Sequence, residues 1–133
     1  MTRKKIMIVD DDKEFLEELE ETLILSGYAA VAINDSTTAL NAARRAKPDL
    51  IILDLKMDVM DGFQVAKSLK QSPETATIPI VAMTGYFTRE EYSSLTTMYG
   101  METCIMKPFN PLDMIAKIEN LLVNELEREN QAE

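Results

Sequence analysis

The sequence predicts an α/β fold with one five-stranded parallel sheet and helices on both of its faces. Short apolar runs alternate five times with longer amphipathic segments, and parallel neighbours need such crossover segments between them. Three of the runs consist almost entirely of the large apolar residues Ile, Leu, Val and Met, which is typical of interior strands covered on both faces. No repeat or linker interrupts the alternation. We therefore expect one domain over residues 1–123, with 124–133 as a polar tail or an extension of the last helix.

The expected strands are the five apolar runs. In chain order they are Ile6–Val9, Ala29–Ile33, Leu50–Leu53, Ile80–Met83 and Thr103–Met106. The first, third and fourth are the runs of large apolar residues, so they are expected in the interior of the sheet. The second is less hydrophobic and is expected nearer an edge.

Three amphipathic segments between these runs predict the first three helices. In the first, apolar residues recur at helical spacing over Phe15–Leu25, and glutamates take most of the other positions. Asp12 is its expected N-terminal cap. The second helix is expected over Ser36–Lys47 and the third over Asp61–Gln71.

Two further segments predict a fourth and a fifth helix. Thr88–Glu91 has the pattern of a capping box, and the helix that it opens is expected to stop at Gly100. Asn110 followed by Pro111 is a typical helix start. We expect this last helix to fray into the polar residues 127–133.

Composition excludes several function classes. The formal net charge is -9 and the chain has no histidine, which disfavours direct nucleic-acid binding, histidine-rich zinc sites and Ser-His catalysis. Any phosphohistidine that serves as a donor must belong to another protein. Because Cys104 is the single cysteine, no internal disulfide can form. The absence of a signal sequence and of a long apolar run predicts a cytoplasmic protein with no membrane segment.

The residues that follow the first, third, fourth and fifth expected strands are the candidates for a functional site. In open parallel sheets the binding crevice lies outside the carboxyl ends of the strands. These positions hold Asp10–Asp12 after the first strand, Asp54 after the third, Thr84–Gly85 after the fourth and Lys107–Pro108 after the fifth. Each taken alone fits a helix cap, a turn residue or a solvated surface group.

Taken together, these groups predict a metal site. Several carboxylates at one edge repel one another and raise their own pKa values unless a cation neutralises them. Oxygen ligands without histidine or cysteine suit a hard ion, typically Mg²⁺ where a phosphoryl oxygen also binds, with Mn²⁺ as an alternative. Lys107 would supply further positive charge.

Five motifs in order resemble the receiver domain of two-component response regulators. They are Val9–Asp12, Leu53–Met57, Met60–Gly62, Met83–Thr84 and Lys107–Phe109. The resemblance covers residues 4–123 and implies a doubly wound, flavodoxin-like sheet with strand order 2-1-3-4-5.

The resemblance also implies a role for each strand-end residue. Asp54 is the phosphoacceptor, and Thr84 and Lys107 hold the phosphoryl group. The metal ligands are Asp11, Asp54, the backbone carbonyl of Lys56 and, through water, Asp10. Thr84 and Gly85 form the switch loop, and the family has a cis bond before the residue equivalent to Pro108.

Several positions depart from the family pattern. Asp58 stands where proline is usual and Val59 where glycine is common, so the loop after Asp54 is expected to differ in shape and charge. Gly85 replaces a frequent alanine. Cys104 stands where the family has the aromatic residue that turns inward with the threonine, and we expect it to be a small buried hydrophobe.

Positions that tune dephosphorylation in the family are Lys56 and Tyr86 here.

The resemblance implies a cytoplasmic phosphoacceptor switch of a phosphorelay, not an enzyme with a separate substrate. Its expected partners are a sensor histidine kinase or a histidine phosphotransfer protein and a downstream protein target. A homodimer through the face of helix four, strand five and helix five is a further expectation. The alternatives are an interaction module that works without phosphorylation and an aspartate-nucleophile phosphatase. Those phosphatases carry a second aspartate two residues after the nucleophile, where this chain has Lys56.

Overall fold

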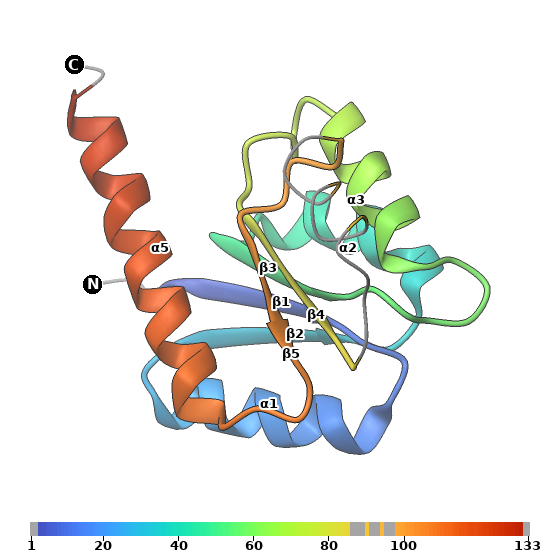
Figure 1. The fold of residues 1–133 in the computed structure, drawn as a ribbon. Coiled ribbons are helices and arrows are strands. Elements are labelled where there is room, and N and C mark those ends of the chain that lie inside the picture. Colours follow the sequence, from blue (N-terminus) through green and yellow to red (C-terminus); the bar gives the residue numbers. More distant parts are fainter. Residues whose placement is uncertain (1–2, 86–89, 91–93, 95–97, 132–133) are drawn as a thin grey trace.

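Five parallel strands form one sheet in the order β2-β1-β3-β4-β5 (Figure 1). The computed structural model describes residues 3–85, 90, 94 and 98–131. The strands are β1 (Lys5–Val9), β2 (Ala29–Ile33), β3 (Leu50–Asp54), β4 (Ile80–Thr84) and β5 (Thr103–Met106). The predicted fold class and strand order are confirmed, and each strand bound lies within one residue of its expected place. As expected for the edge, β2 is only half-buried along its whole length.

Four α-helices connect or follow these strands in the described residues. They are α1 (Lys13–Leu25), α2 (Ala39–Ala46), α3 (Gly62–Gln71) and α5 (Pro111–Gln131). Asp12 caps α1 as predicted, because its side chain accepts a hydrogen bond from the amide of Phe15. The predicted fourth helix, from Thr88 to Gly100, lies largely outside the described residues.

The second helix differs from its predicted bounds at both ends. Residues Ser36–Thr38 form a 3₁₀ turn rather than α-helix. The Asp35 side chain caps that turn by accepting from the amide and the hydroxyl of Thr37. At the other end Lys47 has a φ of 50°, a left-handed conformation that stops the helix one residue early.

The last helix is longer than the polar composition of its end predicts. Fraying from Glu127 onward was expected, but α5 continues to Gln131. Arg128 donates to Glu125 at 2.8 Å, one turn away, and lies 4.0 Å from Glu102, the residue before β5. These ion pairs give the polar end of α5 partners within the helix and on the sheet.

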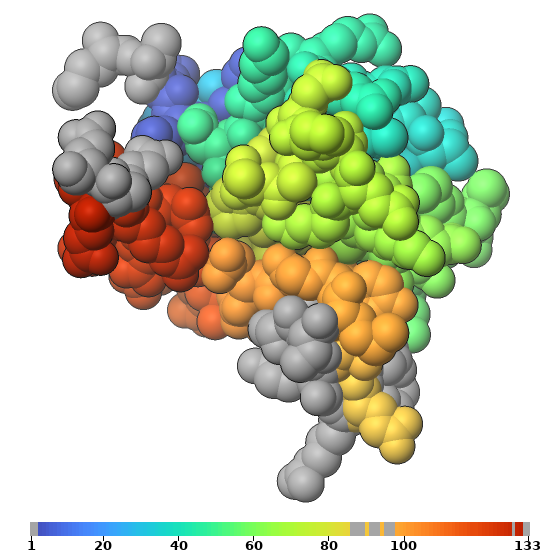
Figure 2. Space-filling view, turned by 90° about the horizontal axis from the view of Figure 1, so that it is seen from above, coloured from blue at the N-terminus to red at the C-terminus, as the bar shows by residue number. Residues whose placement is uncertain are grey.

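Two hydrophobic layers enclose the sheet, one on each face. On one face Ile6 and Ile8 of β1 pack with residues of α1 and α5. On the other face Met7 and Val9 pack with residues of α2 and α3. The alternation follows from the two-residue period of a strand. In the view from above, α5 in red and α3 in yellow-green occupy different sides of the molecule (Figure 2).

Candidate acidic site at the carboxyl edge of the sheet

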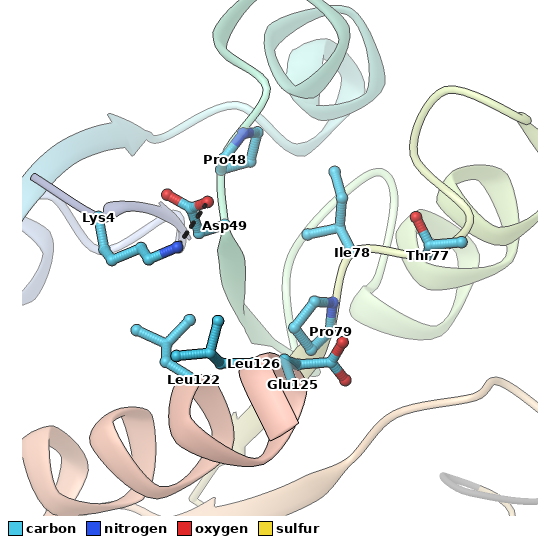
Figure 3. A pocket seen from close by; sticks show the side chains of 9 residues that line it. All are labelled: Lys4, Pro48, Asp49, Thr77, Ile78, Pro79, Leu122, Glu125 and Leu126. Atoms are coloured by element: carbon cyan, nitrogen blue, oxygen red, sulfur yellow. Dashed lines mark ion pairs between the residues drawn. The ribbon is translucent and has the colours of Figure 1, made fainter. Parts of the chain in front are cut away.

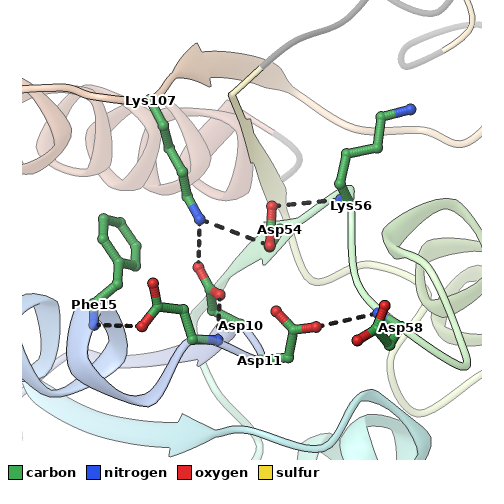
Figure 4. Close-up of polar contacts among 8 residues, drawn as sticks. Asp10, Asp11, Phe15, Asp54, Lys56, Asp58 and Lys107 are labelled. Atoms are coloured by element: carbon green, nitrogen blue, oxygen red, sulfur yellow. Dashed lines mark hydrogen bonds and ion pairs between the residues drawn. The ribbon is translucent and has the colours of Figure 1, made fainter.

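The carboxyl ends of β1, β3 and β5 bring acidic and basic side chains together (Figure 4). Asp10 follows β1 directly, Asp54 ends β3 and Lys107 follows β5. The register aligns these ends, because Val9 pairs with Leu53 across β1 and β3. Strand β4 lies between β3 and β5 and ends in Thr84, which is fully buried.

Three carboxylates form a cluster that could hold a cation. One oxygen from each of Asp10, Asp11 and Asp54 lies within 4.8 Å of the other two. Asp10 and Asp54 are buried, whereas Asp11 is exposed. Burial, and next the charge of Asp10, raises the pKa of Asp54 to about 6, against the opposing effect of Lys107. Three acidic groups in such a place are the ligand set of a hard divalent cation.

Lys107 supplies the positive charge that the cluster has in this structure. Its Nζ donates to Asp10 Oδ2 at 2.7 Å and lies 3.7 Å from Asp54 Oδ2. The backbone amide of Lys107 donates to the carbonyl of Thr84 at 2.7 Å, which extends the pairing of β4 with β5 to the site. The Lys107–Pro108 peptide bond is cis, as the resemblance implies.

Backbone amides orient each carboxylate of the cluster. The amide of Asp12 donates to Asp10 Oδ1 at 2.9 Å, and that of Asp58 donates to Asp11 Oδ2 at 3.1 Å. The amide of Lys56 makes a longer contact of 3.5 Å with Asp54 Oδ1. The loop after β3 therefore reaches across to the residue that follows Asp10.

That loop has two backbone constraints. Val59 has a φ of 66° and its side chain is 92% exposed. A β-branched residue is unfavourable in this left-handed region. Gly62, at the start of α3, packs so closely on β3 that an added Cβ would press on the carbonyl oxygen of Asp54 and lie 2.7 Å from Leu55 Cα. The start of α3 therefore packs directly against the backbone of Asp54, the candidate nucleophile.

Three of the expected switch residues lie on or next to the two strands beyond β3: Thr84 ends β4, Gly85 follows it, and Cys104 lies in β5. Gly85 is exposed, and a Cβ there would meet nothing within 4 Å. Cys104 in β5 is half-buried and packs against the core layer of α2 and α3. Burial raises the pKa of its thiol to about 11. Tyr86 lies outside the described residues.

The structure places the aromatic side chain of Phe15 at the site, which the sequence analysis did not predict. The ring centroid of Phe15 lies 4.2 Å from Lys107 Nζ, and the ring meets Phe109 edge-on at 5.8 Å. Phe15 belongs to the apolar stripe of α1, and that periodicity alone indicates core packing rather than contact with a charged group. The order Lys107-Pro108-Phe109 gave the only local signal of an aromatic neighbour.

A pocket of about 180 Å³ lies at the opposite edge of the sheet (Figure 3). Its lining includes Lys4, Asp49 and Pro79, which precede β1, β3 and β4, together with Leu122 and Leu126 of α5. It is therefore separate from the carboxylate cluster. Within the described residues, no helix has the length and apolarity that crossing a membrane requires.

The fold and this edge define a doubly wound α/β domain with an acidic site and one lysine. Over residues 6–119 the sequence matches the family model for the response regulator receiver domain. The chain belongs to this family, whose members are regulatory modules of two-component systems. Membership supports a phosphoacceptor signalling role.

Curated relatives are about one-third identical to the chain over the aligned residues. The alkaline phosphatase synthesis transcriptional regulatory protein PhoP of Bacillus subtilis is 33% identical over 120 residues, which cover 90% of this chain and 48% of that protein. The DNA-binding response regulator MtrA of Mycobacterium tuberculosis is 33% identical over 120 residues, covering 87% and 49%. The chain thus spans about half the length of these relatives.

Solved structures share the fold over nearly the whole chain. The chemotaxis protein CheY4 of Vibrio cholerae superposes with a TM-score of 0.84 at 28% identity, covering 90% of this chain and 98% of that one. A CheY-like receiver domain protein of Methanospirillum hungatei gives a TM-score of 0.84 at 30% identity, covering 96% and 99%.

Proposed function

We propose that this chain is a phosphoacceptor switch that takes a phosphoryl group onto Asp54 from a phosphohistidine of a partner protein. The observation that carries the proposal is the convergence of Asp54 with two further carboxylates and Lys107 at one edge of the sheet. The donor is a sensor histidine kinase or a histidine phosphotransfer protein, since receiver domains pair with such proteins and this chain has no histidine.

The transfer step uses Asp54 as the nucleophile. A carboxylate oxygen of Asp54 forms a bond to phosphorus while the P–N bond to the donor imidazole breaks, and its electron pair stays on the imidazole nitrogen. A solvent proton then neutralises that nitrogen. With a pKa of about 6, Asp54 is mostly ionised at neutral pH and can attack. Lys107 stands 3.7 Å from the acceptor oxygen, where it neutralises charge on the transferred group.

The donor set of the cluster fits Mg²⁺, with Mn²⁺ as the alternative ion. Asp11, Asp54 and the backbone carbonyl of Lys56 would be direct ligands, and Asp10 would act through water. Oxygen ligands and an exposed Asp11 fit an ion that keeps part of its water shell. When bound, the ion neutralises the carboxylates and the phosphoryl oxygens.

The switch that follows phosphorylation involves Thr84, Gly85 and Cys104. We infer that the Thr84 hydroxyl moves toward the added phosphoryl oxygens, and the open space beside Gly85 leaves room for that movement. An aromatic residue cannot follow the threonine, because its place is taken by Cys104. The output is a changed docking surface for a protein target. Four further expectations stay predictions: a homodimer through the face of helix four, β5 and α5, tuning by Lys56 and Tyr86, a cytoplasmic location and the lack of direct nucleic-acid binding.

The direct test is incubation with acetyl phosphate and Mg²⁺ followed by intact-mass measurement. We expect the mass of one phosphoryl group to be added to the wild type and not to Asp54→Asn. The matched control is Asp49→Asn, an aspartate at the opposite end of the same strand, which should be modified like the wild type. An unmodified wild type would favour the phosphorylation-independent interaction module, and continuous hydrolysis of generic phosphate esters would favour the phosphatase.

A further inference from the structure

The Phe15 ring lies against the ammonium group that serves the candidate phosphoacceptor site. Its centroid is 4.2 Å from Lys107 Nζ, and the Lys107 side chain is only 22% exposed. Phe15 itself is anchored, because its backbone amide donates to the Asp12 cap at 3.2 Å and its ring packs against the core layer of α1 and α5. Phe109 meets the ring at an interplanar angle of 87°. The face that Lys107 contacts is therefore fixed by its surroundings.

We propose that Phe15 is a positioning residue, whose aromatic face holds Lys107 beside Asp54 while the ion pair with Asp10 weakens. This inference rests on the function proposed above. In this structure Lys107 is closer to Asp10 than to Asp54, at 2.7 Å against 3.7 Å. A cation in the carboxylate cluster competes with Lys107 for Asp10, so the ammonium must shift its contacts from Asp10 toward the incoming phosphoryl group.

An aromatic ring suits this position because it attracts a cation without carrying a charge of its own. The ring quadrupole favours an ammonium within about 6 Å of the centroid, more strongly where water is partly excluded. A carboxylate in its place would compete for the divalent cation, and an aliphatic side chain would offer the ammonium no electrostatic partner. Phe15 can therefore keep its contact before and after Lys107 changes its anionic partner.

The chemical step that the ring assists is the uptake of a phosphoryl group by Asp54. With acetyl phosphate, an Asp54 oxygen bonds to phosphorus, the P–O bond to the acetyl group breaks, and the electron pair leaves with acetate. Lys107 neutralises charge on the phosphoryl oxygens. Phe15 touches neither the phosphorus nor its ligands, so it acts only through the placement of Lys107.

A fluorinated-phenylalanine series at position 15 isolates this effect. Mono-, di- and trifluorination weaken the ring quadrupole in steps while the shape changes little. We expect the rate of phosphorylation by acetyl phosphate to fall in the same order, to a total of about three- to tenfold. The matched control is the same series at Phe63, a half-buried phenylalanine that packs on Tyr99 at 4.9 Å. Its rates should not follow the fluorine count.

Two ordinary substitutions and one spectroscopic signal complete the test. Phe15→Tyr should keep the wild-type rate and Phe15→Leu should lose it. The Lys107 side-chain protons nearest the nitrogen should be shifted upfield by the ring current in wild-type NMR spectra, and not in Phe15→Leu. A phosphorylation rate that does not change with fluorination of Phe15, or the absence of the ring-current shift, overturns the positioning role. No phosphorylation of the wild type would instead overturn the proposed function itself, and the ring-current signal separates the two failures because it needs no phosphoryl group.

Discussion

Lys107 Nζ donates a hydrogen bond to Asp10 Oδ2 at 2.7 Å, and this bond joins residues that are 97 positions apart in the chain. Asp10 is fully buried, and Lys107 is its cationic partner in the metal-free protein. A buried carboxylate without its cation is strongly unfavourable, even where the intact pair contributes little net stability. The stability of the site is therefore sensitive to the lysine.

We expect Lys107→Met to lower the free energy of unfolding by about 2–4 kcal/mol in the absence of metal. The cause is the uncompensated Asp10 carboxylate. Lys4→Met is the matched control, because Lys4 is exposed and lies 3.9 Å from Asp49, so its loss should change stability by less than about 1 kcal/mol. Urea unfolding in a chelator measures both. Equal effects of the two substitutions would contradict the dependence of Asp10 on Lys107.

Asp54 makes the stability of the metal-free protein depend on pH. Its pKa is about 6 in the folded chain and near 3.8 in the unfolded chain, so the folded state binds the proton more tightly. The stability associated with this group is present below pH 4 and is lost as the pH rises through about 6. We expect Asp54→Asn to be more stable than the wild type at pH 7 by up to about 3 kcal/mol.

The measurement is urea unfolding of both proteins at several pH values in a chelator. The advantage of Asp54→Asn should grow between pH 4 and pH 6.5 and then level off. Asp49→Asn serves as the control for a general effect of aspartate removal, and it should show no such rise. A constant difference between Asp54→Asn and the wild type over this range would contradict the raised pKa.

A divalent cation should stabilise the wild type, because it binds the folded cluster and not the unfolded chain. Saturation at 100 times the dissociation constant corresponds to about 2.7 kcal/mol. We expect Asp11→Asn to weaken Mg²⁺ binding by about tenfold or more. Asp12→Asn removes a neighbouring charge but keeps the cap of α1, and asparagine caps well. Thermal unfolding against Mg²⁺ concentration measures both affinities, and equal losses would argue against a direct role of Asp11.

Gly62→Ala should destabilise the protein by about 2–4 kcal/mol, since the new methyl group would press on the backbone of Asp54 and Leu55. Because that backbone belongs to the end of β3, we also expect weaker Mg²⁺ binding. Gly85→Ala is the matched control in the same site region. Its Cβ has open space, so its stability should stay within about 1 kcal/mol of the wild type. Urea unfolding at pH 7 compares the two.

Val59→Gly should stabilise the protein by about 0.5–1 kcal/mol. The left-handed conformation of Val59 disfavours a residue with a Cβ by about 1–2 kcal/mol, and the greater chain entropy of glycine offsets part of this gain. Val123→Gly, at an exposed position within α5, should have the opposite effect, a loss of about 0.3–0.5 kcal/mol in helix propensity. A destabilised Val59→Gly would mean that the loop does not hold this conformation in solution.

The strands and the strand-end residues could be predicted because local patterns determine them. Runs of large apolar residues identified β1, β3 and β4, and the topology of a parallel sheet then placed Asp10 and Asp54 at one edge. Features that depend on distant partners could not be predicted. The length of α5 depends on Arg128, which contacts Glu102 from another element. The contact of Phe15 with Lys107 depends on how the fold places α1 beside the segment that follows β5, which periodicity does not describe.

The separation of Asp10 from Lys107 along the chain has a consequence for biogenesis. The acidic residues of the cluster lie in the first 54 positions, whereas their lysine follows β5, a strand at the far edge of the sheet. Because Lys107 is joined to Asp10 across 97 positions of the chain, their contact is long-range, and such contacts form slowly in folding. On the function proposed above, Lys107 can assist phosphoryl transfer only once β5 has docked. We therefore expect a chain whose last strand is undocked to accept a phosphoryl group poorly from its donor.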